Sequence, residues 1–419
     1  MIPLPTRMRN WLIARFRLPA RTQPTPPPVT LDLLARHPDL RPPHVAHCPV
    51  TQRYLDLLGS LPWSHFPERD PNRPWPGRRP YPRRAYVAAF LIKIDQRLRY
   101  MSDLRRFLLD HPTLAWAIGF PLSADGNPHL PGTRQFGRVL RHLDNDALQF
   151  LLTASLRLIQ AELDPDAHLG DIISLDTKHI IAWVKENNLK EHMRDRYLKE
   201  RQPRGDPDCR LGCKERRNQP APAETTPTTN PVPAAHLSPG QYYWGYASGV
   251  VATRLPDTTE VVLAELTQPF DQNDATYFAP LMAQVEQRLG RRPRYGALDA
   301  AFDAFYVYDY FHLAGGFAAV PLARRGGITH RHFTPDGTPL CQAGLPMTLR
   351  YSYQQRTGHH PHPRQRFACP LRFPNPTTRP CPCDHPSRRG NGNGCTVTLP
   401  ATPGSRLRYS LDRTRDAYK

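Results

Sequence analysis

Two aspartates, each at the end of a short apolar run, are the residues with the clearest chemical potential. Asp176 closes the run 171–176 (DIISLD), and Asp299 closes the run 294–299 (RYGALD). Runs of this length predict buried strands, and α/β sheets gather their ligand sites at the carboxyl edge of the strands. Carboxylate oxygens are the ligands that Mg²⁺ prefers. The pattern therefore suits a Mg²⁺ site at Asp176 and Asp299, although it is a weak signal, because many α/β proteins carry such aspartates without a metal.

The chemistry that fits a carboxylate-held metal pair is phosphodiester cleavage and transfer. Two divalent ions about 4 Å apart activate a water or a 3′-hydroxyl and stabilise the leaving oxygen. The charge of the chain agrees with a polyanionic partner, because the chain has 56 Lys and Arg but only 37 Asp and Glu, which gives a net charge of +19. Codon bias in a GC-rich genome is an alternative cause of the excess of Arg over Lys, but it does not explain the shortage of acids.

Three arginines share one face of an expected helix over 133–143. Arg134, Arg138 and Arg141 stand at i, i+4 and i+7. A basic helical face of this kind suits contact with DNA phosphates or insertion into a groove. An ordinary solvated basic face is the alternative.

The rest of the chain is expected to form three parts that position these residues. Residues 1–80 are rich in Pro and Arg and predict an irregular arm with one short helix near 51–61. Residues 81–165 predict an all-α, DNA-binding domain, with apolar periodicity over 85–100, 102–110, 133–143 and 146–163. Residues 166–419 predict a mixed α/β sheet. Its expected strands are 171–176, 245–255, 259–266, 294–298 and 317–322, and its expected helices are 275–289 and 304–314.

Two loop-rich insertions are expected to interrupt the sheet domain, at about 183–240 and 324–408. The second insertion contains Cys369, Cys381, Cys383 and Cys395, which could hold a structural Zn²⁺. The one-residue spacing of Cys381 and Cys383 is tighter than in the usual zinc knuckle, so free thiols are the alternative.

Several separate blocks of the chain resemble bacterial insertion-sequence transposases of the DDE, RNase H-like superfamily. The matching blocks are SLDTKHI at 174–180, GDPDCRLG at 205–212, YYWGYASG at 242–249, RRPRYGALDAAFD at 291–303 and LDRTRDAYK at 411–419. The helical region 85–163 is also similar to the N-terminal domain of that family. The resemblance covers most of the chain and implies an RNase H-like fold for 166–419.

The resemblance implies roles for individual residues. Asp176 and Asp299 would be the first two catalytic aspartates and would bind Mg²⁺ or Mn²⁺, and Lys178 would contact DNA phosphate. Asp303 is expected to cap the following helix rather than bind metal. The partners would be double-stranded DNA, both terminal inverted repeats and target DNA, bound by a homodimer. No membrane contact is expected, and the location would be the cytoplasm of a bacterium, on the nucleoid.

One part of the family pattern is not found. The third carboxylate of these transposases is a Glu on a helix shortly after the Tyr-Lys pair at 418–419, whereas no Glu occurs between Leu322 and Lys419. We therefore expect a catalytic domain without its C-terminal helix and an impaired activity. The alternative is an inert DNA-binding remnant or a repressor of transposition.

Overall fold

The computed structural model describes residues 29–70, 80–163, 168–213, 242–323, 331–356, 360–375, 383 and 395–411. The chain divides into two compact units, Met1–Leu163 and Asp164–Lys419. None of the helices in the described ranges combines the length and the apolar character that crossing a membrane requires.

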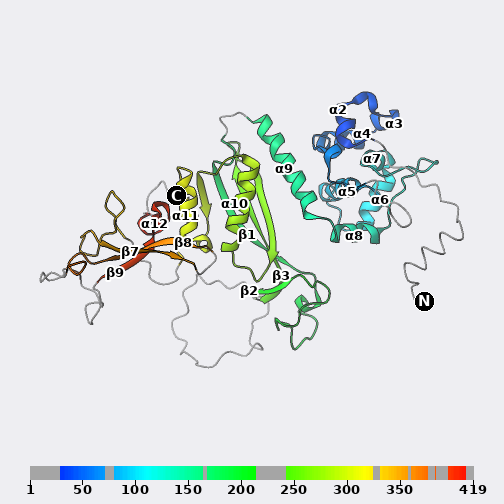
Figure 1. Ribbon diagram of the computed structural model, residues 1–419. Helices are drawn as coiled ribbons and strands as arrows, with labels where there is room; N and C mark the ends of the chain where they lie inside the picture. Colours follow the sequence, from blue (N-terminus) through cyan, green and yellow to red (C-terminus); the bar gives the residue numbers. More distant parts are fainter. Residues whose placement is uncertain are drawn as a thin grey trace. The chain divides into compact units, whose positions relative to one another are not determined.

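The regular secondary structure in the described residues of the first unit is helical, apart from one isolated bridge between Leu122 and Pro128 (Figure 1). A single core of buried side chains joins its helices, from Leu31 near the start to Leu151 near the end. Its α-helices are α2 (Leu31–Arg36), α3 (Pro43–Ala46), α4 (Pro49–Leu58), α5 (Arg83–Asp95), α6 (Met101–Asp110), α7 (Pro112–Ala117), α8 (Thr133–Arg141) and α9 (Asn145–Glu162).

The expected boundary at residue 80 is wrong. Residues 29–70 are not an irregular arm, because they form three α-helices and two 3-10 turns and share the core of the residues that follow. The prolines that suggested irregularity include Pro43 and Pro49, which stand in the first turns of α3 and α4. Proline is tolerated there because the backbone N–H that it lacks has no partner within the helix. Residues 1–28 lie outside the described residues.

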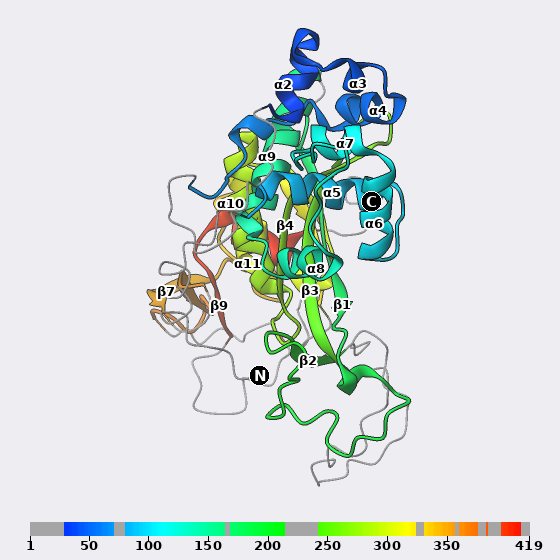
Figure 2. The same ribbon diagram turned by 90° about the vertical axis from the view of Figure 1, so that its right-hand side faces the viewer.

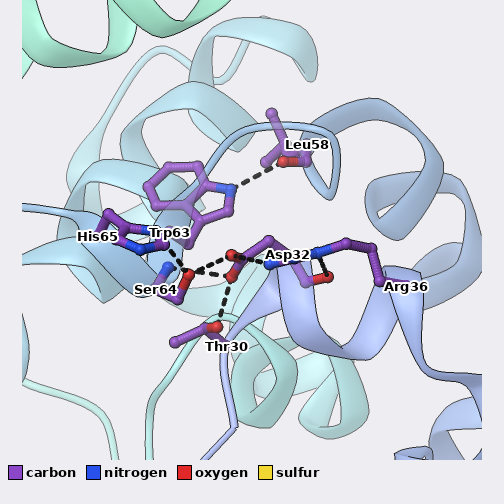
Figure 3. A network of polar contacts seen from close by, with 7 residues as sticks. All are labelled: Thr30, Asp32, Arg36, Leu58, Trp63, Ser64 and His65. Atoms are coloured by element: carbon purple, nitrogen blue, oxygen red, sulfur yellow. Dashed lines mark hydrogen bonds and ion pairs between the residues drawn. The ribbon is translucent and has the colours of Figure 1, made fainter.

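A buried carboxylate, Asp32, connects α2 to the 3-10 turn that contains Ser64 (Figure 3). Asp32 is 1% exposed and accepts hydrogen bonds from the Ser64 backbone N–H at 3.0 Å, the Ser64 hydroxyl at 2.6 Å and Arg36 at 2.8 Å. The Thr30 hydroxyl also donates to it. These contacts join α2 to the 3-10 turn at Trp63–His65. Burial alone would raise the pKa of Asp32, but the hydrogen bonds outweigh it and hold that pKa below its ordinary value.

The second unit is built on a mixed sheet with β1 in its middle. β1 (Ile172–Ile181) pairs antiparallel with β3 (Tyr242–Arg254) and parallel with β5 (Tyr295–Leu298), and β5 pairs parallel with β6 (Phe317–Ala319). On its other side, β3 pairs with β2 (Arg210–Cys213) and β4 (Glu260–Pro269). Figure 2 shows β1 and β3 running together toward β2. The α/β class and the mixed sheet are thus as expected.

Two helices pack on this sheet, α10 (Ala275–Leu289) and α11 (Phe305–Leu313). Glycine in the strands lets them approach closely. A Cβ on Gly249 of β3 would lie 2.5 Å from Cδ1 of Tyr277, and one on Gly296 of β5 would lie 2.3 Å from Cζ of Phe311. Both aromatic rings are fully buried, so they form the centre of the layer between the helices and the sheet.

The expected second insertion, 324–408, is not only loop. It contains a three-stranded antiparallel sheet of β7 (Thr348–Gln355), β8 (His362–Ala368) and β9 (Thr396–Pro400), followed by α12 (Pro403–Ser410), which packs on α11. Within the expected first insertion, β2 belongs to the main sheet. Residues 214–241, which include its Pro- and Thr-rich part, lie outside the described residues.

Candidate active site

The structure brings Asp176 and Asp299 to neighbouring positions on adjacent strands. β1 and β5 run parallel with Leu175 opposite Leu298, and each aspartate directly follows one of these leucines. One detail of the prediction is wrong, because Asp176 does not end its strand. β1 continues to Ile181, since β3 pairs with it along this whole stretch, whereas β5 ends at Leu298. Asp176 therefore lies where β1 loses its parallel neighbour.

Both carboxylates are accessible to a ligand. Along β1, Ile173 and Leu175 are buried while Asp176 is exposed, as the alternation of a strand requires. The Thr177 backbone N–H donates to Oδ1 of Asp176 at 2.7 Å. Asp299 is exposed as well, and its Oδ1 accepts from the Ala301 backbone N–H at 2.9 Å, at the start of a 3-10 turn.

A third carboxylate, which the sequence did not single out, belongs to the same neighbourhood. Asp274 stands at the start of α10 without capping it, and its Oδ1 accepts from the Thr177 hydroxyl at 3.2 Å. The pKa of Asp299 is raised, first because protein atoms displace water around it and then because Asp274 and Asp176 are negative. The pair Asn273-Asp274 before an apolar run is a helix-start signal, and it could have drawn attention to this residue.

Lys178 and two other polar residues on or next to β1 have distinct surroundings. Lys178 is exposed and lies two residues beyond Asp176, hence on the same face of β1. The next residue, His179, lies with its ring 4.3 Å from that of Phe270. Asp171 lies at the opposite end of β1 and pairs with Arg291.

The expectation for Asp303 is wrong. Ala304, not Asp303, precedes α11 as its cap residue, and the Asp303 side chain is fully buried. It accepts from the Tyr308 hydroxyl and the Ala323 backbone N–H, both at 2.9 Å, and pairs with Arg408 of α12. Asp303 therefore holds elements together and is not free to bind a metal.

The carboxylates fit Mg²⁺ better than a metal that needs a closed protein cage. In the described ranges, no three His, Cys, Asp or Glu side chains already stand together as a metal site. Mg²⁺ keeps several waters and is commonly held by one or two carboxylates together with substrate phosphates. Exposed oxygens of Asp176 and Asp299 meet that requirement.

The three arginines of the expected basic face lie on α8, and all are exposed. Phe136 on the opposite side is fully buried and anchors the helix in the core of the first unit. Arg134, Arg138 and Arg141 therefore project from a fixed helix. Their role in binding DNA stays a prediction.

The cysteines expected to bind zinc are only partly described. Cys369, Cys383 and Cys395 lie in one cluster beside the three-stranded sheet, and Cys381 lies outside the described residues. Cys341, which was not among the expected zinc ligands, belongs to the same cluster.

Comparisons with known proteins give no evidence about the function of the chain. No family model, no curated protein and no solved structure matches the chain.

Proposed function

We propose that the chain is a DDE transposase that binds transposon-end DNA and catalyses metal-dependent strand cleavage and transfer. The observation that carries the proposal is the placement of Asp176 and Asp299 on adjacent parallel strands, with Leu175 and Leu298 in register. This arrangement puts two exposed carboxylates, far apart in the sequence, at one edge of a central sheet.

The order of the strands supports an RNase H-like fold for the second unit. The sheet runs β4-β3-β1-β5-β6 if β2 is set aside, with antiparallel pairing first and parallel pairing after β1. A helix precedes β5 and another precedes β6. The strands β1, β3 and β4 thus pair antiparallel, and the later strands β5 and β6 pair parallel and alternate with helices.

In the proposed reaction, each residue has a defined task. Mg²⁺ or Mn²⁺ bound at the site would activate the attacking water or 3′-hydroxyl and stabilise the leaving oxygen. Asp176 and Asp299 would hold the metal through their exposed oxygens. Lys178, on the same face of β1, would pair with a DNA phosphate and orient the scissile strand. The arginines of α8 would contribute phosphate contacts elsewhere on the DNA.

The test of catalysis uses a supercoiled plasmid that carries the DNA flanking the gene of this chain. We expect strand breaks at fixed positions that require Mg²⁺ or Mn²⁺, and their loss in Asp176→Asn and Asp299→Asn. Asp257→Asn is the matched control, because Asp257 lies in the turn between β3 and β4, where its carboxylate accepts hydrogen bonds from Thr259. Cleavage that survives Asp299→Asn would refute the catalytic assignment.

The alternative is a protein that binds the same DNA without cutting it, as a remnant or a repressor of transposition. The exposed basic face of α8 is the observation that favours it. Arg138→Ala should weaken binding to the flanking DNA and reduce the slope of log affinity against log salt by about 1. Arg157→Ala on α9, also exposed, is the control. Salt-sensitive binding without cleavage in either metal would leave this alternative in place of the transposase.

A further inference from the structure

Four cysteines from distant parts of the sequence belong to one side-chain cluster beside the three-stranded sheet, and one pair of them, Cys341 and Cys383, is in sulfur contact. Cys369 directly follows β8, and Cys395 directly precedes β9. The backbone N–H of Cys369 donates to the carbonyl of Cys395 at 2.8 Å, so the two cysteines face each other where the ladder ends. Cys341 and Cys383 pack in the same cluster.

The second pair, Cys341 and Cys383, is in direct contact through sulfur. Their Sγ atoms are 3.6 Å apart, across 42 residues of sequence. A tetrahedral zinc ion with Zn–S bonds of about 2.3 Å separates two ligand sulfurs by about 3.8 Å. Cys341 and Cys383 therefore already stand at the spacing of two zinc ligands, although neither is bonded to the other.

The backbone forms tight turns at two of these cysteines, Cys341 and Cys369. Cys341 donates from its N–H to the Leu345 carbonyl at 2.9 Å and accepts from the Gly344 N–H at 2.9 Å, with Gly344 in the left-handed region at φ +76°. The carbonyl of Cys369 accepts from the N–H groups of Arg372 and Phe373. Each cysteine thus begins a short turn that starts beside the sheet.

We propose that Cys341, Cys369, Cys383 and Cys395 form a structural Zn²⁺ site at the end of the three-stranded sheet. Cys341 replaces Cys381 in the expected ligand set, because the sulfurs of Cys341 and Cys383 are in contact. The zinc would complete the site by drawing the four thiolates together through rotation about their single side-chain torsions.

A zinc site explains the composition of this cluster better than packing does. Exposures of 7% for Cys341, 1% for Cys369 and 2% for Cys383 bury three thiols in a small sheet whose apolar core otherwise contains few large side chains. A metal contributes folding free energy directly to small sheets of this kind. The four thiolates would carry the charge needed to bind Zn²⁺, and binding would release their protons.

The first test measures zinc in the full chain, purified without a polyhistidine tag from zinc-supplemented cultures. We expect one zinc per chain in the wild type and in Cys381→Ser, and loss of the zinc in Cys341→Ser and Cys383→Ser under a competing chelator. Cys209→Ser is a further control, since Cys209 is fully buried in another cluster. A wild type without zinc overturns the site, and loss of zinc in Cys381→Ser overturns the ligand set.

The second test needs no variant and so does not depend on whether a variant folds. Cysteines of the wild type are alkylated before and after zinc is removed, and each site is quantified by mass spectrometry. We expect chelation to increase the labelling of Cys341, Cys369, Cys383 and Cys395, while Cys381 is labelled equally in both states. Unchanged labelling of Cys341 on chelation would contradict the proposal.

Discussion

Arg408 donates two hydrogen bonds to Asp303, from Nε to Oδ1 and from Nη2 to Oδ2, each at 2.9 Å. The pair joins α12 to the chain segment just after Asp299, and the Asp303 side chain is completely buried. Removing one partner of a buried ion pair leaves an uncompensated charge in the interior.

Arg408→Ala should therefore lower the free energy of unfolding of the second unit by about 3–5 kcal/mol. The measurement is denaturant unfolding of the full chain. Arg53→Ala is the matched control, because Arg53 is more than half exposed in its ion pair with Asp95, and such pairs contribute about 1 kcal/mol or less. Equal losses in the two variants would contradict the structural role of Arg408.

Asp274→Asn should shift the pKa of Asp299 downward, toward its ordinary value. The pKa of the exposed Asp299 is raised by nearby protein atoms that displace water and by the charges of Asp274 and Asp176. The substitution removes one of these charges while keeping an oxygen for Thr177. The pH at which Mn²⁺ begins to bind should fall accordingly, because a metal needs the ionised carboxylate. Carboxyl NMR titration checks the shift, and an unchanged Asp299 titration would refute it.

The raised pKa of Asp299 also determines how its contribution to the free energy of unfolding changes with pH. A carboxyl whose pKa is higher in the folded state binds its proton more tightly there, so its contribution is lost as the pH rises through that range. In the absence of metal, Asp299→Asn should thus make the second unit more stable at neutral pH than the wild type. Asp257→Asn, in an exposed turn, should not.

Asp32 gives the opposite dependence on pH. Its pKa is lower in the folded protein than the ordinary value of 3.8, so its contribution to stability is present above that value and is lost as the pH falls below it. Asp32→Asn should cost about 1–3 kcal/mol at neutral pH, since donors around it lose an acceptor. In urea unfolding, the difference in stability between the variant and the wild type should shrink below about pH 4.

Two glycines should respond oppositely to the same substitution. Gly249→Ala would place a Cβ 2.5 Å from the Tyr277 ring and 3.0 Å from Leu281, so we expect a loss of about 1–3 kcal/mol. Gly137→Ala on α8 meets no atom within 4 Å and should stabilise the helix by up to about 1 kcal/mol. Thermal unfolding of both variants makes the comparison, and stabilisation by Gly249→Ala would show that α10 packs differently.

The elements that the sequence predicted well are those whose own apolar pattern defines them. The expected helix 275–289 agrees with α10 residue for residue, and β5 was expected within one residue of its start. The three-stranded sheet was missed because β7 has no buried side chain and alternates tyrosine with polar residues, so no apolar run indicates it. In residues 29–70, α4 corresponds to the helix expected near 51–61, whereas α2 and α3 were missed because the proline-rich composition suggested irregular structure.

The candidate sites show the same division. Asp176 and Asp299 could be proposed from the sequence because each follows an apolar run. The sequence marks Asp274 only as a helix start and does not mark Cys341, since their contacts with Thr177 and Cys383 depend on the tertiary structure. Proximity between distant segments is set by tertiary structure, and a local pattern does not contain it.

The unequal lengths of β1 and β5 give the two candidate metal ligands different mechanical properties. Asp176 lies inside a ladder that continues on both sides of it, so displacing its backbone would require breaking hydrogen bonds to β3. Asp299 follows the last residue of β5 and begins a single 3-10 turn, whose few bonds can rearrange locally. One carboxylate thus serves as a fixed reference point, while the other can adjust as the charge and coordination of a bound ion change.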